Sequence, residues 1–456
     1  MVDNNLRTPY SINLTFGIQR ELPWKMILDT SYVGTLGRKL MVKPDLGQFY
    51  GLFTDPASGQ NFWGAYNQLV NFQGPDPYNP SVDPYSMSAL ATIPNIAFFD
   101  HVMPNLPAYL ANFLGEADIP YSMLTPTQAF YAMFATNTYA SYADPVGYIF
   151  DVPPAVCDPA DCIGSPYSSA VDPEGNGLVL FHPQFQSIPT WMNWGNSHFH
   201  SLQVGLRRDF GAYTFGANYV WSKSIDNGSS PENADLFAAN GSLTGQMTNA
   251  LFPGGDRGLS DFDVRHNFNA HWIIDLPFGQ GRPLGRNAHG WLNQIIGGWQ
   301  FAGDWRWRTG FPLSPGNGFN FATNWYLTPP STQTGVIASS VTKKDPDGVP
   351  NLFKDPNSII SRLAYTRPGG VGTRNAVRGP AYSNVDTGLH KEFKLPMEGH
   401  SLQFRWTVFN AFNTVNFNPS DIDFDIEAGA TFGRIYSTAG PRGGAREMEF
   451  ALRYSF

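Results

Sequence analysis

The last eleven residues of the chain, REMEFALRYSF (Arg446–Phe456), alternate strictly between apolar and polar side chains. Successive side chains of a β-strand point to opposite faces, so this period of two produces one apolar and one polar face. A tilted strand crosses a bilayer with about 9–11 residues and often carries aromatic residues at the interface. The stretch therefore predicts the membrane-crossing last strand of a β-barrel, with an apolar face formed by Met448, Phe450, Leu452, Tyr454 and Phe456.

The same alternation recurs at eight places upstream, which gives nine predicted strands in all. The other eight are Tyr10–Gln19, Lys25–Val33, Ser201–Arg208, Tyr213–Ser222, Asn267–Leu276, Trp299–Arg308, Ser383–Lys391 and Ser401–Val408. A soluble β-sandwich also alternates, but its strands are usually about 5–6 residues long and its core is poorer in aromatic residues. We therefore predict an all-β fold, an antiparallel transmembrane β-barrel of which about 9–11 strands are visible. The aromatic residues expected to face lipid are Trp272, Trp299, Trp305, Trp307, Phe404 and Trp406.

The composition agrees with this fold class. Only 14% of the residues are charged, against roughly 25% in a typical soluble domain. No stretch approaches the roughly 18 unbroken apolar residues of a transmembrane helix. The net charge of −8 argues against nucleic acid as a partner. The expected partner is outer-membrane lipid, and no cofactor is expected.

Short and long connections alternate between the predicted strands. The short ones are Arg20–Trp24, Asp209–Ala212 and Lys394–Gly399, with a medium one over Pro277–Gly298, and the long ones are Gly37–Asn196, Lys223–Asp263, Phe311–Tyr382 and Asn413–Gly443. Outer-membrane barrels put short turns in the periplasm and long loops outside. The C-terminus is then periplasmic, and the first strand begins outside the cell. Complete barrels have an even number of strands and both ends in the periplasm, so nine strands with an outside start predict a truncated barrel. The lack of a signal peptide in Met1–Arg7 leads to the same expectation.

Several segments resemble the C-terminal barrel of TonB-dependent receptors, particularly the Oar-like group. They cover about half the chain and nearly all of its predicted strands. The matching segments are Arg7–Gly37, His200–Asn227, Ser260–Gly281, Gly297–Gly310, Gly372–Phe393 and Leu402–Phe456.

The resemblance implies a barrel of about 22 strands closed by a plug. Such a receptor is energised through TonB and imports a scarce or bulky nutrient or chelate across the outer membrane. This chain shows no plug and no TonB box, so contact with the TonB complex is expected only through a missing N-terminal region. The barrel assembly machinery is expected to read the last strand, at Phe450, Leu452, Tyr454 and Phe456. The alternative is a self-contained smaller barrel that acts as an adhesin or scaffold.

The longest connection, residues 37–196, is acidic and aromatic. From Pro44 to Leu206 there is no Lys or Arg, but there are thirteen Asp or Glu residues. One interpretation is a folded extracellular cap that captures a small molecule, glycan or peptide, or binds calcium. The other is that the Asp-Pro pairs only form turns and the aromatic residues only fill the loop's own core. We also predict a short helix within Thr125–Tyr142, capped near Thr125, and a disulfide between Cys157 and Cys162.

The hypothesis that the barrel is an enzyme has little support in the sequence. His198 and His200 share a strand face and could together hold a metal. His271 and Asp275 also share a face, but a separation of four residues places them roughly 13 Å apart, too far for a direct acid–base pair. No GxSxG, HExxH or P-loop motif occurs. We therefore expect neither a catalytic nor a metal site.

Overall fold

The computed structural model describes twelve segments of the chain. They are residues 1–48, 51–52, 54–76, 78–136, 142, 188–229, 247–318, 320–323, 327–337, 343–397, 399–439 and 444–456. Cys157 and Cys162, for which we predict a disulfide, lie outside these segments.

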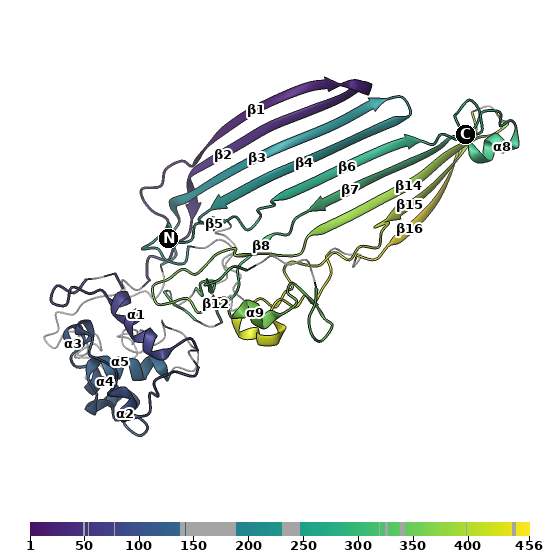
Figure 1. Cartoon of the computed structure of the whole chain (residues 1–456). Coiled ribbons are helices and arrows are strands. Elements are labelled where there is room, and N and C mark those ends of the chain that lie inside the picture. The colour runs from purple at the N-terminus through teal and green to yellow at the C-terminus, as the bar shows by residue number, and fades with distance from the viewer. Residues whose placement is uncertain are drawn as a thin grey trace.

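Nine long strands form one antiparallel sheet in chain order (Figure 1). They are β1 (Tyr10–Leu22), β2 (Met26–Val42), β3 (Met192–Phe210), β4 (Tyr213–Asp226), β6 (His266–Asp275), β7 (Trp299–Arg308), β14 (Tyr382–Lys394), β15 (Ser401–Phe409) and β16 (Glu447–Ser455). The two-residue strand β5 (Gly258–Leu259) pairs with the end of β4. Each predicted strand corresponds to one of the nine, so the predicted all-β, antiparallel fold class is confirmed.

Several strands are longer than the alternation predicts, and β2 and β3 exceed their predicted ranges the most. β2 continues to Val42 and β3 already begins at Met192, so the connection predicted over residues 37–196 is limited to residues 43–191. Pairing continues there with register shifts on either side of Leu40, where Lys39 has a φ of 54°. Side chains that lie beyond a bilayer need not alternate between apolar and polar. The alternation in the sequence therefore ends, while the backbone pairing of β2 with β3 continues.

The register places the predicted aromatic residues on one face of the sheet. One row of neighbours across five strands is Ile274, Phe301, Leu389, Trp406 and Phe450. Ring contacts run along the same face, including Trp406 against Phe450 at 5.8 Å between centroids. We call this side the apolar face, and it includes Trp272, Trp299, Trp305, Trp307, Phe404, Trp406, Phe450, Leu452 and Tyr454.

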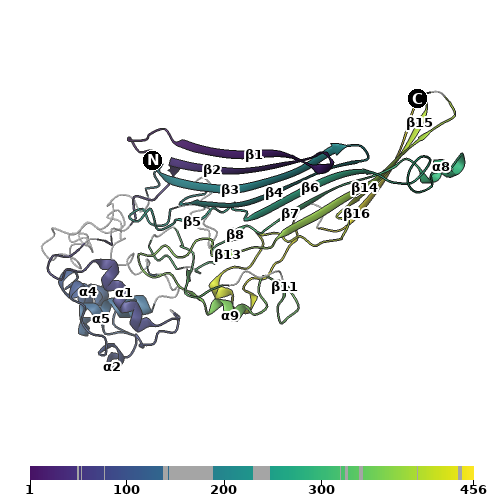
Figure 2. The ribbon, with the colours of Figure 1, turned by 45° about the horizontal axis from the view of Figure 1, so that its top comes forward.

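Connections of different length gather at opposite ends of the twisted sheet (Figure 2). The short-turn end has the 3-10 turn η1 (Pro23–Lys25), residues 211–212, residues 395–400, and a longer connection that contains α8 (Trp291–Ile296). The C-terminus lies at the same end of the sheet as α8, whereas the N-terminus lies at the long-loop end (Figure 1). There Met1 N donates to Pro189 O at 2.6 Å. The predicted alternation of loop lengths is confirmed.

Five helices in the first long connection form a compact unit, which we call the cap. They are α1 (Phe62–Gln73), α2 (Met87–Leu90), α3 (Ala97–Val102), α4 (Leu106–Leu114) and α5 (Pro126–Ala135), with the turn η2 (Tyr121–Met123) before α5. The fully buried centre consists mainly of aromatic rings, and Phe130 contacts Phe62, Tyr66 and Phe99. Thr125 caps α5 in a reciprocal capping box with Gln128, as predicted.

The other long connections carry small elements beneath the same end of the sheet. They are β8 (Pro312–Leu313), β9 (Thr332–Gln333), β10 (Lys343–Lys344), β11 (Pro350–Asn351), α9 (Pro356–Ile360), β12 (Leu363–Ala364), β13 (Val377–Arg378) and η3 (Ile426–Thr431). They share a second core around Leu352, Phe353 and Phe432. The cap and these loops therefore form two packed units at the long-loop end.

Neither edge of the sheet is covered by another strand of the described chain. β1 pairs only with β2, and β16 pairs only with β15. The sheet is therefore open here and forms part of a barrel wall. Among the described helices, none has the length and apolar character needed to cross a membrane.

Candidate functional site

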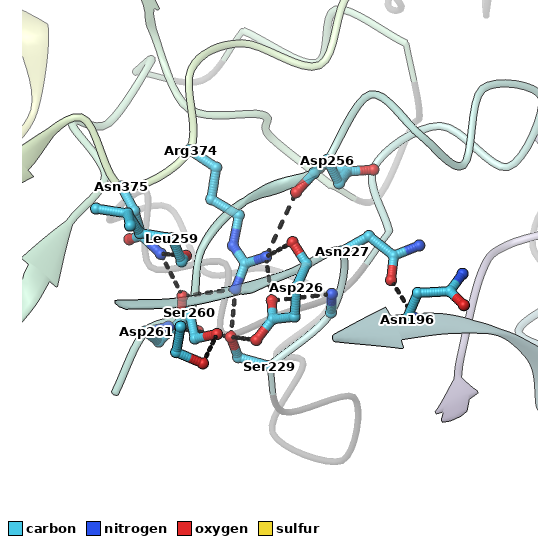
Figure 3. A network of polar contacts seen from close by, with 12 residues as sticks. Asn196, Asp226, Asn227, Ser229, Asp256, Leu259, Ser260, Asp261, Arg374 and Asn375 are labelled. Atoms are coloured by element: carbon cyan, nitrogen blue, oxygen red, sulfur yellow. Dashed lines mark hydrogen bonds and ion pairs between the residues drawn. The ribbon is translucent and has the colours of Figure 1, made fainter. Parts of the chain in front are cut away.

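Arg374 lies at the centre of a buried polar cluster at the long-loop end of the sheet (Figure 3). Its guanidinium donates to Asp226 Oδ1 at 2.7 Å and to Asp261 Oδ1 at 2.9 Å, and it also donates to Ser229 Oγ. The Arg374 side chain is only 8% exposed. We call this group the rim network, and its members are Asp226, Ser229, Asp256, Asp261, Arg374 and Asn375.

The rim network joins a strand end to two different loops. Asp226 is the last residue of β4, and its carboxylate accepts hydrogen bonds from Gly228 N and Ser229 Oγ in the loop that follows. Arg374 and Asn375 arrive from the connection between β7 and β14. Asn375 has a φ of 56°, a conformation that asparagine tolerates better than most residues. Its side-chain amide reaches Asp261 Oδ1 at 2.7 Å and Leu259 O at 2.5 Å.

A second arginine repeats the arrangement next to the sheet. Arg378 forms an ion pair with the buried Asp263 and donates to Asp263 O at 2.7 Å. Asp263 Oδ1 in turn accepts from Ser224 N of β4 at 2.5 Å. Because both arginines bridge the same two loops, these loops are held to each other and to β4 by charge-assisted hydrogen bonds.

Charges in the rim network are balanced by close partners. Burial alone would lower the pKa of Arg374, but Asp261 and Asp226 raise it above its ordinary value. Burial raises the pKa of Asp256 to about 6, although Thr248 donates to its carboxylate through N and Oγ1 at 2.9 and 2.8 Å. The folded loop therefore disfavours ionisation of the Asp256 carboxyl.

Hydrogen bonds fasten the cap and its adjoining segments to the same loops. Gln48 Nε2 donates to Asn249 Oδ1 at 2.8 Å, and Asn249 Nδ2 donates to Gly369 O at 3.1 Å. From α1, Asn67 Nδ2 reaches Pro368 O at 2.9 Å, and Arg367 donates to Asn71 Oδ1 at 2.9 Å. The cap is therefore attached to the loop that also carries Arg374.

A further contact between the cap and the last long loop involves two tyrosines and one carboxylate. Tyr78 and Tyr365 both donate to Glu427 Oε1, at 2.6 and 3.2 Å. Burial and the nearby carboxylate raise the pKa of both phenols above their ordinary value. The phenols thus remain protonated donors, and these hydrogen bonds join the cap to the last long loop.

Comparison with known proteins identifies the type of domain. A family model described as an outer membrane beta barrel domain matches residues 1–97 and 143–449. The chain belongs to the outer membrane β-barrel domain family. This family membership agrees with the antiparallel sheet and supports a location in the bacterial outer membrane.

Three chains among the solved structures match this chain, and one of them is an outer membrane transporter. The outer membrane transporter YddB from Escherichia coli is similar at 9% identity and a TM-score of 0.37. The match covers 100% of this chain and 34% of that one, so the barrel domain described here spans about a third of the length of YddB. A search of the curated proteins yields no match.

The histidines weighed as metal ligands have other partners in this barrel domain. His200 Nδ1 lies 2.7 Å from the Tyr32 hydroxyl, and His198 Nε2 lies 3.1 Å from an Arg38 guanidinium nitrogen. Asp275 accepts from Arg282 at 3.2 Å and from Gln300 at 3.0 Å. Within the described segments, no three or more His, Cys, Asp or Glu side chains form a group that could hold a metal ion.

The acidic and aromatic residues of the cap are mostly explained by its own folding. Asp76 Oδ1 and Asp83 Oδ1 accept from the backbone N–H two residues later, at 3.0 and 2.9 Å, as turn-forming Asp residues do. Asp55 binds Ser58 N at 2.7 Å in the same manner. Together with the buried rings, these turns support the structural interpretation for the described part of the loop; Asp144, Asp158 and Asp172 lie outside the described residues.

Sequence reasoning missed the rim network. Its arginine side lies in Gly372–Phe393, and its carboxylate side lies in or just before Ser260–Gly281. Both segments carry the family resemblance. The signal available in the sequence was a pair of arginines, Arg374 and Arg378, in one loop and a group of carboxylates within Asp256–Asp263 in another. Nothing local indicates that these two segments meet, because more than 100 residues separate them.

Proposed function

We propose that this chain is the C-terminal barrel part of a TonB-dependent outer-membrane receptor of the Oar-like group. Such a receptor would take up a nutrient or chelate in an energy-dependent way. The observation that carries the proposal is the long-loop end, where buried ion pairs hold two loops to the end of β4 and further hydrogen bonds attach a folded cap and the last long loop to them. A preorganised set of loops over one end of a barrel suits ligand capture, because binding then requires little ordering of the protein.

The open sheet edges support a larger barrel. A bilayer does not tolerate unpaired backbone groups at the edges of a sheet. We propose that β1 and β16 pair with further strands in the intact receptor, and that the apolar face contacts lipid. Contact with the TonB complex would then involve regions other than this chain. The barrel assembly machinery would recognise the last strand through Phe450, Leu452, Tyr454 and Phe456.

The proposed orientation has the cap outside the cell and Phe456 in the periplasm. Single-cysteine variants of a cysteine-free protein (Cys157→Ser, Cys162→Ser) test it: Tyr85→Cys in the cap and Met397→Cys at the short-turn end, both exposed. In intact cells a membrane-impermeant maleimide should label only the cap position, and permeabilisation should expose the other. Labelling of Met397→Cys alone in intact cells would reverse the orientation.

Uptake is tested with a deletion strain supplied separately with siderophores, cobalamin, oligosaccharides or peptides. We expect loss of accumulation of one of these classes, and restoration by the full-length protein only when TonB is present. The alternative function is an adhesin or scaffold, favoured by the burial of most cap aromatic rings in the cap's own core. Unchanged uptake of all four classes together with reduced surface attachment would replace the receptor proposal with that alternative. We propose no enzymatic role.

A further inference from the structure

Helix α8, at the short-turn end, exposes large apolar side chains. Trp291 is 75% exposed, Ile295 is 57% exposed and Leu292 is 42% exposed. The helix is only six residues long and has no buried residue. A soluble helix normally turns such residues toward a core, so this surface is unexplained by the fold alone.

Lys391 shows on which side of the sheet α8 lies. In the register, Lys391 of β14 is the neighbour of Trp299 and Phe404, so it belongs to the apolar face. Its ammonium donates to Gly297 O at 2.5 Å and to Ile295 O at 3.1 Å, and also to Gln294 O. Trp299 Nε1 donates to Ile295 O at 2.8 Å. The C-terminal turn of α8 is therefore held against the apolar face.

The contact with α8 provides hydrogen-bond acceptors for the charged ammonium of Lys391 on the apolar face. An ammonium on a lipid-facing surface is costly unless its donors are paired, and Lys391 is only 2% exposed. An ammonium has three donors, and the three carbonyls at the negative end of the helix accept all of them. Displacing α8 would leave the charge of Lys391 without these partners, so the helix is fixed at this position.

The connection around α8 also has a charge bias. Between Asp275 and Asp304 there is no acidic residue, while Arg282, Arg286 and His289 are present. Arg282 is paired with Asp275 at 3.2 Å, and Arg286 and His289 are exposed. Exposed cationic side chains beside exposed apolar ones are typical of segments that lie in a lipid headgroup layer.

We propose that α8 is an interfacial anchor that rests in the phospholipid headgroup layer at the short-turn end of the barrel. Trp291, Leu292 and Ile295 enter the boundary with the acyl chains, and Arg286 faces the lipid phosphates. Lys391 is a positioning residue that holds the helix beside the membrane. The inference rests on the proposed lipid contact of the apolar face, to which α8 is attached through Lys391 and Trp299.

Spin-label accessibility in phospholipid vesicles tests the anchor. Nitroxides are attached to Ile295→Cys, to Phe450→Cys as a reference on the apolar face, and to Tyr85→Cys as a reference in the cap, each in the full-length protein without Cys157 and Cys162. For Ile295→Cys we expect accessibility to dissolved oxygen several-fold above that to a water-soluble nickel chelate, as for Phe450→Cys. A reversed ratio, as for Tyr85→Cys, would overturn the anchor, as would protection from both reagents, which indicates a protein partner or a second copy.

The reference positions separate failure of the anchor from failure of the proposed function. If the Phe450→Cys probe is itself exposed to water, the lipid contact of the sheet is wrong. If Phe450→Cys is in lipid and Ile295→Cys is in water, only the anchor is wrong. Adding Lys391→Met to Ile295→Cys should lower the oxygen-to-nickel ratio toward the aqueous value, whereas Lys391→Arg retains a cationic donor and should lower it less. An unchanged ratio in Lys391→Met would remove the positioning role.

Discussion

Single residues at the long-loop end carry charges that are removed from water but closely paired. Arg374 and Asp226 are 8% and 4% exposed, and Asp263, the partner of Arg378, is fully buried. Removing water from an ion pair is costly, and close hydrogen-bonded partners offset part of that cost, although Arg374 Nε and Asp261 Oδ2 have no hydrogen-bond partner among the described residues. Such residues specify how loops meet more than they add to overall stability.

Replacing Arg374 should loosen the loops without dissolving the sheet. In Arg374→Met the buried carboxylate of Asp226 and the partly exposed carboxylate of Asp261 lose their counter-charge, and removing one partner of a buried pair costs about 3–5 kcal/mol. We expect much faster proteolysis within residues 227–265, with unchanged insertion into membranes. The exposed Arg286→Met is the matched control and should leave the cleavage rate unchanged; equal rates in the two variants would contradict the rim network.

Asp256 makes the same loop sensitive to pH. Its pKa is raised to about 6 in the folded loop against an ordinary value of 3.8. Above pH 6 the carboxyl is charged in both folded and unfolded loop. Between pH 6 and 4 only the folded loop binds the proton, so acidification stabilises the loop, by up to about 3 kcal/mol.

Hydrogen exchange at the Thr248 amide measures this effect. After correction for the intrinsic pH dependence of exchange, protection should rise as the pH falls from 7 to 5. Asp256→Asn cannot titrate, so its protection should not change over this range. Protection that falls on acidification in the wild-type loop would show that the charged form of Asp256 is the one preferred.

At the scale of elements, the cap and the strands are stabilised in different ways. The cap has a core of aromatic rings, with Phe62, Phe98, Phe99 and Phe130 fully buried. The strands are connected by backbone hydrogen bonds to their neighbours, and many of their side chains are exposed. A defect in the cap core should therefore remain local.

Phe130→Ala tests this separation. Loss of a buried phenylalanine costs about 3–5 kcal/mol, a large share of the stability of a small helical unit. We expect protease sensitivity confined to residues 62–135, while the gel mobility shift between heated and unheated protein is retained. Met123→Ala, at a 74% exposed position, is the control. Loss of the mobility shift in Phe130→Ala would mean that the cap is required for barrel formation.

The two faces of β16 should respond differently to a charge. Leu452 is on the apolar face and its neighbour Ala451 is on the opposite face. An arginine costs about 2–4 kcal/mol at the bilayer midplane and less near the interfaces. We therefore expect Leu452→Arg to reduce the fraction of protein that folds into vesicles and Ala451→Arg to leave it nearly unchanged. Equal loss in both variants would refute the assignment of the faces.

At the scale of the whole molecule, the open edges at β1 and β16 are the decisive feature. Because neither edge is paired with another described strand, residues 1–456 expressed alone should not form a closed barrel that resists detergent. We expect no mobility difference between heated and unheated samples of this chain, in contrast to the larger barrel that we propose. A heat-modifiable band from residues 1–456 alone would favour the smaller self-contained barrel.

Strands, faces and loop lengths could be predicted because they depend on local pattern. The period of two in Arg446–Phe456 determines which side chains share a face, whatever the neighbouring strands are. The short turn between Tyr10–Gln19 and Lys25–Val33 likewise predicts that these two strands are antiparallel neighbours. The ends of β2 and β3 could not be predicted, because pairing continues past the residues that alternate.

The amino-acid sequence by itself thus determined the nine strands, their apolar face and the alternation of short and long connections, since each depends on residues that are neighbours along the chain. Only the tertiary structure decided that Arg374 meets Asp226, 148 residues away, and that Lys391 meets the end of α8, 94 to 97 residues away. The physical reason is that a buried charge is satisfied by whichever polar groups the fold brings within reach, and no local periodicity records that choice.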